Sequence, residues 1–170
     1  MAKPGRPGEP VFRSAAFDDI PQPDFADVVL VSIPATDHPI IEDPAWWAER
    51  VFSLRSMPRW IALLLGLRQM LVRLIGVNRA PSSVFDVKSV VGEEALIAGD
   101  DSHLDFRAGV AVDVRQRLLR VTTVVRFHGW RGRLYFLPVG LLHDPITRAM
   151  ARRAVRDFVR EGKMRSDDRR

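Results

Sequence analysis

The sequence has no cysteine among its 170 residues. Disulfides, thiolate nucleophiles and zinc sites built on cysteine are therefore excluded, and a reducing, cytoplasmic compartment is expected. A secretory signal is not expected, because Lys3, Pro4, Arg6 and Pro7 interrupt the segment in which such a signal needs about 7–15 apolar residues. The Gly-x-Ser-x-Gly elbow that would indicate an α/β-hydrolase triad is also absent.

Uninterrupted apolar runs of membrane-spanning length are missing as well. The longest apolar stretch, Trp60 to Val77, contains Arg68, Gln69 and Arg73 at its middle, where a charge costs several kcal/mol in a bilayer. We interpret this stretch as a buried helix, with binding at a membrane surface as the alternative. No stable membrane insertion is expected.

The net charge of +5 comes from the C-terminal end of the chain. From Arg148 onward nine cations face four anions, so 9 − 4 gives +5, and the rest is balanced at 17 against 17. Such an end can attract nucleic acid or anionic lipid, but a series of interleaved aromatics for base stacking is lacking. We interpret it as a solvent-facing surface and expect no nucleic-acid partner. The pairs Glu93–Glu94 and Asp100–Asp101 are interpreted as solvated turn residues.

Proline and glycine divide the chain into one domain and two tails. Residues 1–12 are predicted to be a disordered Pro/Gly-rich tail, residues 13–162 a single domain, and residues 163–170 a basic disordered tail. Apolar and β-branched residues predict strands at residues 25–33, 84–91, 95–98, 102–114, 118–128 and 132–139. Helix-start signals predict two helices after the first strand, starting at Asp43–Pro44 and at about residue 58, and a long C-terminal helix after Asp144–Pro145.

This order predicts an α+β fold in which an antiparallel sheet of about six strands curves around a long C-terminal helix. The strand register follows from keeping apolar residues on one face. A four-residue turn at residues 114–117 pairs Asp105 with Arg126, and a two-residue turn at Trp130–Arg131 sets Arg126 opposite Tyr135. The apolar face is expected to meet the helix, because burying the arginine-bearing face would carry a large desolvation cost.

Six short motifs follow one another along residues 24–160: Asp24-Phe25-Ala26-Asp27, Asp43-Pro44 with the following Trp pair, His103-Leu104-Asp105-Phe106-Arg107, Thr122-Thr123-Val124-Val125, Gly132-Arg133-Leu134-Tyr135 and His143. With this order the chain resembles the START-like (SRPBCC) helix-grip superfamily, which includes lipid-transfer proteins, polyketide aromatase/cyclase domains and relatives of plant pollen allergens. Within it, the chain resembles a bacterial family of domains of unknown function, number 2867. The resemblance implies a cavity between sheet and helix, but it offers no established catalytic residues.

The apolar sheet face is the predicted ligand-binding surface. Sites for small molecules are lined mainly by apolar and aromatic groups with a few placed polar ones. The residues expected to line it are Trp60, Phe106, Val110, Val121, Thr123, Val125, Phe127 and Phe136. We therefore expect the domain to bind a hydrophobic or amphipathic small molecule without a cofactor. A filled core without a cavity is the alternative.

An enzymatic role is the second hypothesis, and whether the protein is an enzyme stays open at this point. His143 is expected in a loop before the last helix, near the cavity mouth, where its near-neutral pKa suits a general acid or base. With Tyr135 and Thr123 it forms the candidate catalytic set for a cyclase, dehydratase or isomerase acting on a polyketide-like or steroid-like substrate. A single loop histidine is, however, more often a surface or helix-start residue.

The opposite sheet face is polar and collects His103, Asp105, Arg107, Arg126 and His128. Asp105 is expected to pair with Arg126 across the strands and with Arg107 along its own strand, each pair contributing roughly 0.2–1 kcal/mol. Clustered arginines also suit an anion-binding surface or a subunit interface, so an interaction protein and a homodimer are left open. No metal site is predicted, because the arginines would repel a cation bound by His103 and Asp105.

Overall fold

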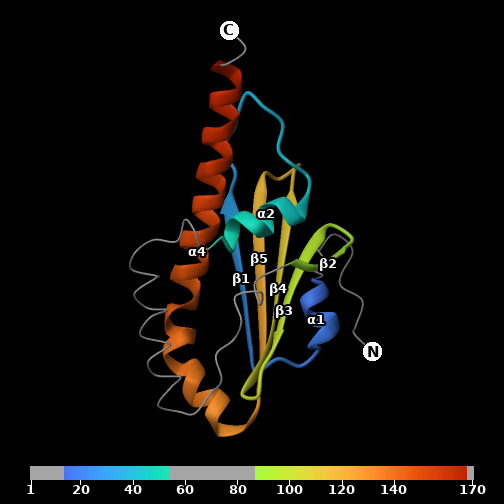
Figure 1. Cartoon of the computed structure of the whole chain (residues 1–170), viewed down its shortest axis with the longest axis vertical. Coiled ribbons are helices and arrows are strands. Elements are labelled where there is room, and N and C mark those ends of the chain that lie inside the picture. The colour runs from blue at the N-terminus through green and yellow to red at the C-terminus, as the bar shows by residue number, and fades with distance from the viewer. Residues whose placement is uncertain (1–13, 54–86, 168–170) are drawn as a thin grey trace, which may run out of the picture.

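The computed structural model describes residues 14–53 and 87–167 (Figure 1). The predicted helix over residues 58–75, which includes Trp60, and the predicted tail at residues 1–12 lie outside the described residues. None of the helices within the described ranges is both long and apolar enough to span a membrane. The elements are α1 (Ala15–Asp19), β1 (Phe25–Ser32), α2 (Pro44–Val51), β2 (Val87–Val91), β3 (Glu94–Asp100), β4 (Leu104–Asp113), β5 (Leu118–Phe127) and α4 (Gly129–Asp167).

The five strands form one open antiparallel sheet in the order β1-β5-β4-β3-β2. The turn at residues 114–117 joins β4 to β5 and pairs Asp105 with Arg126, which confirms the predicted register. Asp113 fixes this turn by accepting a hydrogen bond from the backbone N of Gln116 at 2.8 Å. β1 joins the other side of β5, so β1 and β2 are the edges of the described sheet.

The helices cover the sheet on two faces. Successive side chains of a strand point to opposite faces, so Val110 and Val121 lie in the main core with α2 and the second half of α4. Leu96 and Val124 lie on the other face, where they pack against Ala16 and Ile20 at α1. The result is a layered α+β arrangement with α1 on one face and α2 and α4 on the other, in which α4 follows a curved path along the side of the sheet (Figure 1).

The main core is centred on α2 and the second half of α4. Asp43 caps α2 as predicted, because its side chain accepts a hydrogen bond from the backbone N of Ala45 at 2.9 Å, with Pro44 at the first helical position. Trp47 is fully buried, and its ring centroid lies 5.2 Å from that of Phe158 on α4. Arg50 links the same two helices through a 2.8 Å ion pair with Glu161.

Residues 132–139, predicted as a sixth strand, are helical, because α4 begins at Gly129. The predicted turn at Trp130–Arg131 and the pairing of Arg126 with Tyr135 are therefore wrong. Tyr135, Phe136 and Val139 share one side of a helix and pack together against the strands. A short apolar run fits a strand or a helix equally well, and here packing against the sheet selects the helix.

Pro138 and Pro145 lie inside α4. Each proline lacks a backbone N–H, which leaves the carbonyl four residues earlier without its helical partner. Those carbonyls belong to Leu134 and Leu141, which are 47% and 82% exposed, so water can replace the missing bonds. Asp144–Pro145 is therefore not the start of the helix, and His143, predicted in a loop, is a helical residue.

Candidate functional site

A second apolar cluster, separate from the main core, lies between the first half of α4 and the strands. We call it the aromatic cluster; its buried members are Leu104, Val125, Tyr135 and Phe136, with Phe25, Phe106, Phe127 and Val139 partly buried around them. The ring centroid of Phe136 lies 4.7 Å from that of Phe25 and 5.0 Å from that of Phe127. Its partly buried rings leave some aromatic surface exposed.

A polar pair, Asp27 and His143, lies at the rim of this cluster. Nδ1 of His143 lies 3.0 Å from Oδ2 of Asp27, and the imidazole packs edge-on against Phe25 at 5.3 Å between ring centroids. The side chains of His143 and Asp27 are 16% and 22% exposed. A carboxylate at this distance favours the proton on Nδ1, which leaves Nε2 as a hydrogen-bond acceptor.

The candidate catalytic residues divide into two groups. Thr123 is the direct cross-strand partner of Asp27, so Thr123, Asp27 and His143 lie together at the face of the sheet that meets α4. Tyr135 lies eight positions before His143, which is about 12 Å along the helix axis. Its ring packs against His103 instead, at 4.7 Å between centroids. The structure therefore joins two of the three predicted residues and separates the third.

Asp27 was missed by sequence reasoning. Its position alternates with Phe25 and Val29 on β1, and all three point to the face that packs against α4. A carboxylate in an otherwise apolar alternation is a signal that could have drawn attention to it, because a buried charge requires a partner. The partner itself, His143, is 116 positions away and could not be assigned without the fold.

The residues predicted to line a ligand cavity also fall into two groups, one in the aromatic cluster and one in the main core. Val125, Phe127 and Phe136 belong to the aromatic cluster, and Phe106 contacts both that cluster and the main core. Val110 and Val121 are instead closely packed in the main core at 0% and 1% exposure. The partly exposed aromatic surface among these residues is therefore at the first half of α4.

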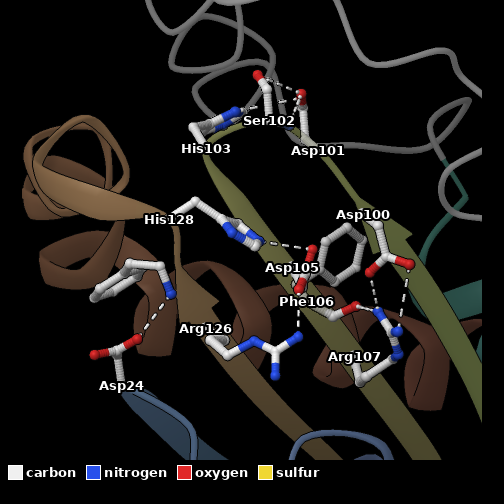
Figure 2. Close-up of polar contacts among 11 residues, drawn as sticks. Asp24, Asp100, Asp101, Ser102, His103, Asp105, Phe106, Arg107, Arg126 and His128 are labelled. Atoms are coloured by element: carbon white, nitrogen blue, oxygen red, sulfur yellow. Dashed lines mark hydrogen bonds and ion pairs between the residues drawn. The ribbon is translucent and has the colours of Figure 1, made fainter.

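On the other face of the sheet, Asp105 is held between Arg126 and His128 (Figure 2). Its Oδ2 lies 2.8 Å from Nη2 of Arg126 and its Oδ1 lies 3.0 Å from Nε2 of His128. Burial alone would raise the pKa of Asp105, but hydrogen bonds and positive charge from Arg126 and His128 hold it below its usual value. Both carboxylate oxygens thus have a side-chain partner.

The remaining residues of the predicted polar surface have other partners. Arg107, expected to pair with Asp105, instead donates hydrogen bonds to Asp100 (Figure 2). It also donates one to Asp19. His103 is buried, and its Nδ1 lies 3.4 Å from Oδ2 of Asp101. The predicted cluster is therefore three separate carboxylate pairings, only partly open to solvent.

The family described as a protein of unknown function (DUF2867) matches residues 20–150. The chain belongs to this family. The matched range includes β1, the whole described sheet and the first half of α4, and therefore both Asp27 and His143. Comparisons with curated proteins and with solved structures found no match.

Glu94 of this DUF2867 domain is a second residue that sequence reasoning misplaced. It was interpreted as a solvated turn residue, but it is 4% exposed and accepts hydrogen bonds from Ser14 Oγ at 3.0 Å and from the backbone N of Ala15 at 2.6 Å. A Cβ added to Gly109 would collide with the Glu94 carboxylate. Glu94 therefore fastens the start of α1 to the sheet, which is a structural role.

Two open grooves occur on the described surface of the DUF2867 domain, both away from the aromatic cluster. One, of about 290 Å³, is lined by Arg50, Ser53, Asp157, Arg160 and Glu161. The other, of about 380 Å³, is lined by Leu30, Val31, Ser32, Arg152, Val155 and Arg156. Within residues 14–53 and 87–167, no three histidine, aspartate or glutamate side chains are grouped so that they could hold a metal ion.

Proposed function

We propose that this domain binds a hydrophobic or amphipathic small molecule between the sheet and the first half of α4. The observation that supports this is the contact of Phe25 with both Phe136 and His143, which joins apolar rings to a polar pair in one place. Small-molecule sites combine apolar walls with a few fixed polar groups in this way. The apolar part of the ligand would displace or overlie the rings, and its polar end would meet Asp27 and His143.

The charge of Asp27 and the hydrogen-bonding groups around it indicate which class of ligand fits the site. Asp27 is an anion when ionised and repels a carboxylate or phosphate group placed beside it. Nε2 of His143 accepts a hydrogen bond and the Thr123 hydroxyl both donates and accepts one. A neutral amphiphile that carries a hydroxyl or carbonyl group therefore fits these partners better than a fatty acid.

The first experiment is native mass spectrometry of the full chain as purified, followed by solvent extraction, and a fluorescence titration with the neutral probe N-phenyl-1-naphthylamine. Wild type is expected to carry an extractable apolar compound or to bind the probe. Phe136→Ala should weaken probe binding at least about tenfold, a loss of about 1.4 kcal/mol. Val90→Ser, which removes an exposed apolar side chain from β2, is the matched control and should leave binding unchanged.

The binding proposal is contradicted by either of two results. One is a wild-type protein that neither carries an apolar compound nor binds the probe. The other is a Phe136→Ala protein that is folded by circular dichroism and binds the probe as tightly as wild type.

A cyclase, dehydratase or isomerase acting on a polyketide-like or steroid-like substrate is a second candidate, favoured by the 3.0 Å contact between Asp27 and His143. In such a pair Nε2 takes a proton from a carbon next to a carbonyl and Asp27 stabilises the resulting imidazolium. The imidazolium, whose proton exchanges with water, then returns a proton to another atom of the substrate. The reaction is then an isomerisation and needs no oxidant or co-reactant. Thr123 would position the substrate oxygen.

Deuterium exchange tests this second candidate. In D2O, wild type should introduce deuterium into the compound extracted from it or into an added 5-androstene-3,17-dione probe. His143→Gln should abolish the exchange, Asp27→Asn should slow it about 10- to 100-fold, and Asp144→Asn, at the exposed neighbouring position, should not change it. Exchange that persists in His143→Gln would eliminate this role.

We also propose that the domain belongs to the START-like superfamily, comes from a bacterium and is cytoplasmic. The order of β1, α2, antiparallel sheet and long C-terminal helix supports membership of the superfamily. The lack of cysteine supports a cytoplasmic location. The alternative of an arginine-rich interaction surface is weakened, because Arg107 and Arg126 are already bonded to carboxylates. Homodimerisation is tested by the same native mass spectrum.

A further inference from the structure

The first half of α4 carries a second apolar surface, on the side that faces away from the sheet. We call it the outer stripe; it consists of Trp130, Leu134, Leu137 and Leu141, which are 66%, 47%, 64% and 82% exposed. Their spacing of four, three and four residues places them along one line of the helix, because each residue turns the helix by about 100°. Tyr135 and Phe136 lie on the opposite side, in the aromatic cluster.

Two arginines flank the outer stripe, one on each side. Viewed along the helix axis, Arg131 lies about 100° from the line of the outer stripe on one side, and Arg133 lies about 60° from it on the other. The guanidinium of Arg131 lies 5.6 Å from the ring centroid of Trp130. The Arg133 side chain is 74% exposed and lies 3.9 Å from Oδ1 of Asp24, which is a weak surface ion pair. The outer stripe is therefore apolar along its centre and basic at its margins where α4 begins.

A stripe of this composition fits a lipid surface better than a second copy of the chain. Full burial of four such side chains would cover on the order of 500 Å² per partner, less than the ~800 Å² per partner of a stable interface. Two copies that paired in parallel would also bring Arg131 and Arg133 close to their equivalents. A bilayer interface instead accepts a tryptophan and leucines in its outer hydrocarbon and gives arginines anionic headgroups.

We propose that the outer stripe docks this domain on the surface of an anionic bilayer, with the first half of α4 parallel to the membrane plane. Trp130 and the three leucines enter the boundary between headgroups and acyl chains, and Arg131 and Arg133 contact lipid phosphates. The aromatic cluster then faces away from the bilayer. This attachment is peripheral, in agreement with the lack of a membrane-spanning helix among the described elements.

The experiment is sedimentation of the full chain with vesicles of phosphatidylcholine alone or mixed equally with phosphatidylglycerol. Wild type should bind the mixed vesicles at least about tenfold more strongly than the neutral ones, and added salt should weaken the binding. The double variant Leu137→Ser/Leu141→Ser should lose at least about tenfold in binding to the mixed vesicles. Arg131→Gln/Arg133→Gln should remove most of the preference for anionic lipid.

The matched control is Val90→Ser/Val91→Ser, which removes two side chains of 52% and 49% exposure from β2 at the opposite edge of the sheet. It should bind vesicles as wild type does. Equal binding by the leucine double variant would overturn the proposal and assign the attraction to the basic C-terminal end. The absence of binding by wild type would also overturn it.

Two further outcomes would identify a different occupant of the outer stripe. A concentration-dependent dimer that the leucine double variant abolishes, without vesicle binding, would assign the stripe to a second copy. A large loss of thermal stability in that variant would show that another part of the same chain covers the stripe. Neither outcome depends on a bound small molecule, so this test is independent of the proposed ligand.

Discussion

The two halves of α4 differ in what they pack and in what they leave exposed. The second half contributes Ala151, Ala154, Val155 and Phe158 to the main core, all at 5% exposure or less. Its small residues let the helix approach the sheet closely, which is how interiors reach high packing density. The first half contributes aromatic rings to a partly open cluster and exposes the outer stripe. One continuous helix thus combines a closely packed segment with a segment that leaves apolar side chains exposed.

The contacts that hold the two halves of α4 in place also differ. The second half is linked to α2 by the ion pair of Arg50 with Glu161, and Gly162 makes room for the ring of His38, which packs on Phe158 at 4.5 Å. In the first half, the hydrogen bond of His143 to Asp27 connects α4 to β1. The weak surface ion pair of Arg133 with Asp24 is a second link. We expect this end to be easier to displace, because its apolar cluster is only partly buried.

Truncation of one phenylalanine in each half is the strongest test of this comparison. Phe158→Ala should lower the free energy of unfolding by about 3–5 kcal/mol, because it leaves a cavity in a closed core. Phe136→Ala should lower it by about 2 kcal/mol or less, because solvent and its partly buried neighbours can fill the space. Urea denaturation followed by circular dichroism measures both. Equal losses would show that the first half is as firmly packed as the second.

Replacing one glycine in each half by alanine should change the stability of the fold by a smaller amount, and the two changes should differ in sign. Gly162→Ala should destabilise the fold by about 1–3 kcal/mol, because the new Cβ would collide with the His38 ring. At Gly140 the nearest atom to an added Cβ is a ring carbon of Phe136 at 3.0 Å, a contact that a small ring shift relieves. Gly140→Ala should therefore be neutral or stabilise α4 by up to about 1 kcal/mol. Thermal melts measure the stability of both variants. A large destabilisation by Gly140→Ala would contradict the looser packing of the first half.

The smallest expected effect on stability comes from the contacts of Asp105 with Arg126 and His128, just before the first half of α4. The pKa of Asp105 lies below its usual value, so the folded state binds fewer protons than the unfolded state near that pKa. The stabilisation by its ion pairs is thus complete above the ordinary value of 3.8 and is lost as the pH falls through the lower folded-state pKa. Its partners are half exposed, so Asp105→Asn should cost about 1 kcal/mol at pH 7.

Denaturation of wild type and Asp105→Asn at pH 7 and at pH 2–3 measures this contribution. The difference between the two proteins should shrink at the lower pH, because protonation of the wild-type carboxylate increases as the pH falls toward its folded-state pKa. Asp37→Asn, at an exposed position between β1 and α2, provides a control for the general effect of removing a carboxylate. A difference that stays constant with pH would show that the ionised form of Asp105 does not stabilise the fold.

The sheet could be predicted from the sequence much better than the candidate site. Alternation along residues 104–113 and 118–127, with a turn between them, leaves only one register that keeps the apolar residues on one face, and that register is confirmed. The apolar run at residues 132–139 carries no such constraint, since no partner strand is defined by a turn signal, and the strand prediction was wrong. Pro145 then reinforced the error, because a proline at a solvent-facing helical position resembles a helix start.

The polar pair at the aromatic cluster depends on information that local sequence does not contain. His143 could be selected as a candidate from its chemistry alone, but its position in a helix and its carboxylate partner follow from the packing of α4 against β1. The prediction for Tyr135 failed for a related reason, because the register that set it opposite Arg126 does not exist and its ring packs against His103. Functional pairs that bridge distant segments therefore require the tertiary structure, whereas a hairpin register does not.

The pairing of β1 with β5 has a consequence for how the chain reaches this structure during synthesis. Phe25 pairs with Val125, so β1 leaves the ribosome about 100 residues before its only described strand partner exists. The β4–β5 hairpin, in contrast, can close as soon as its short turn is made. Until then, the alternating apolar residues of β1 have no sheet to join, which exposes the nascent chain to association with other chains. β1 can therefore join the sheet only after β5 has been made, and a chaperone that shields residues 25–32 would act during that interval.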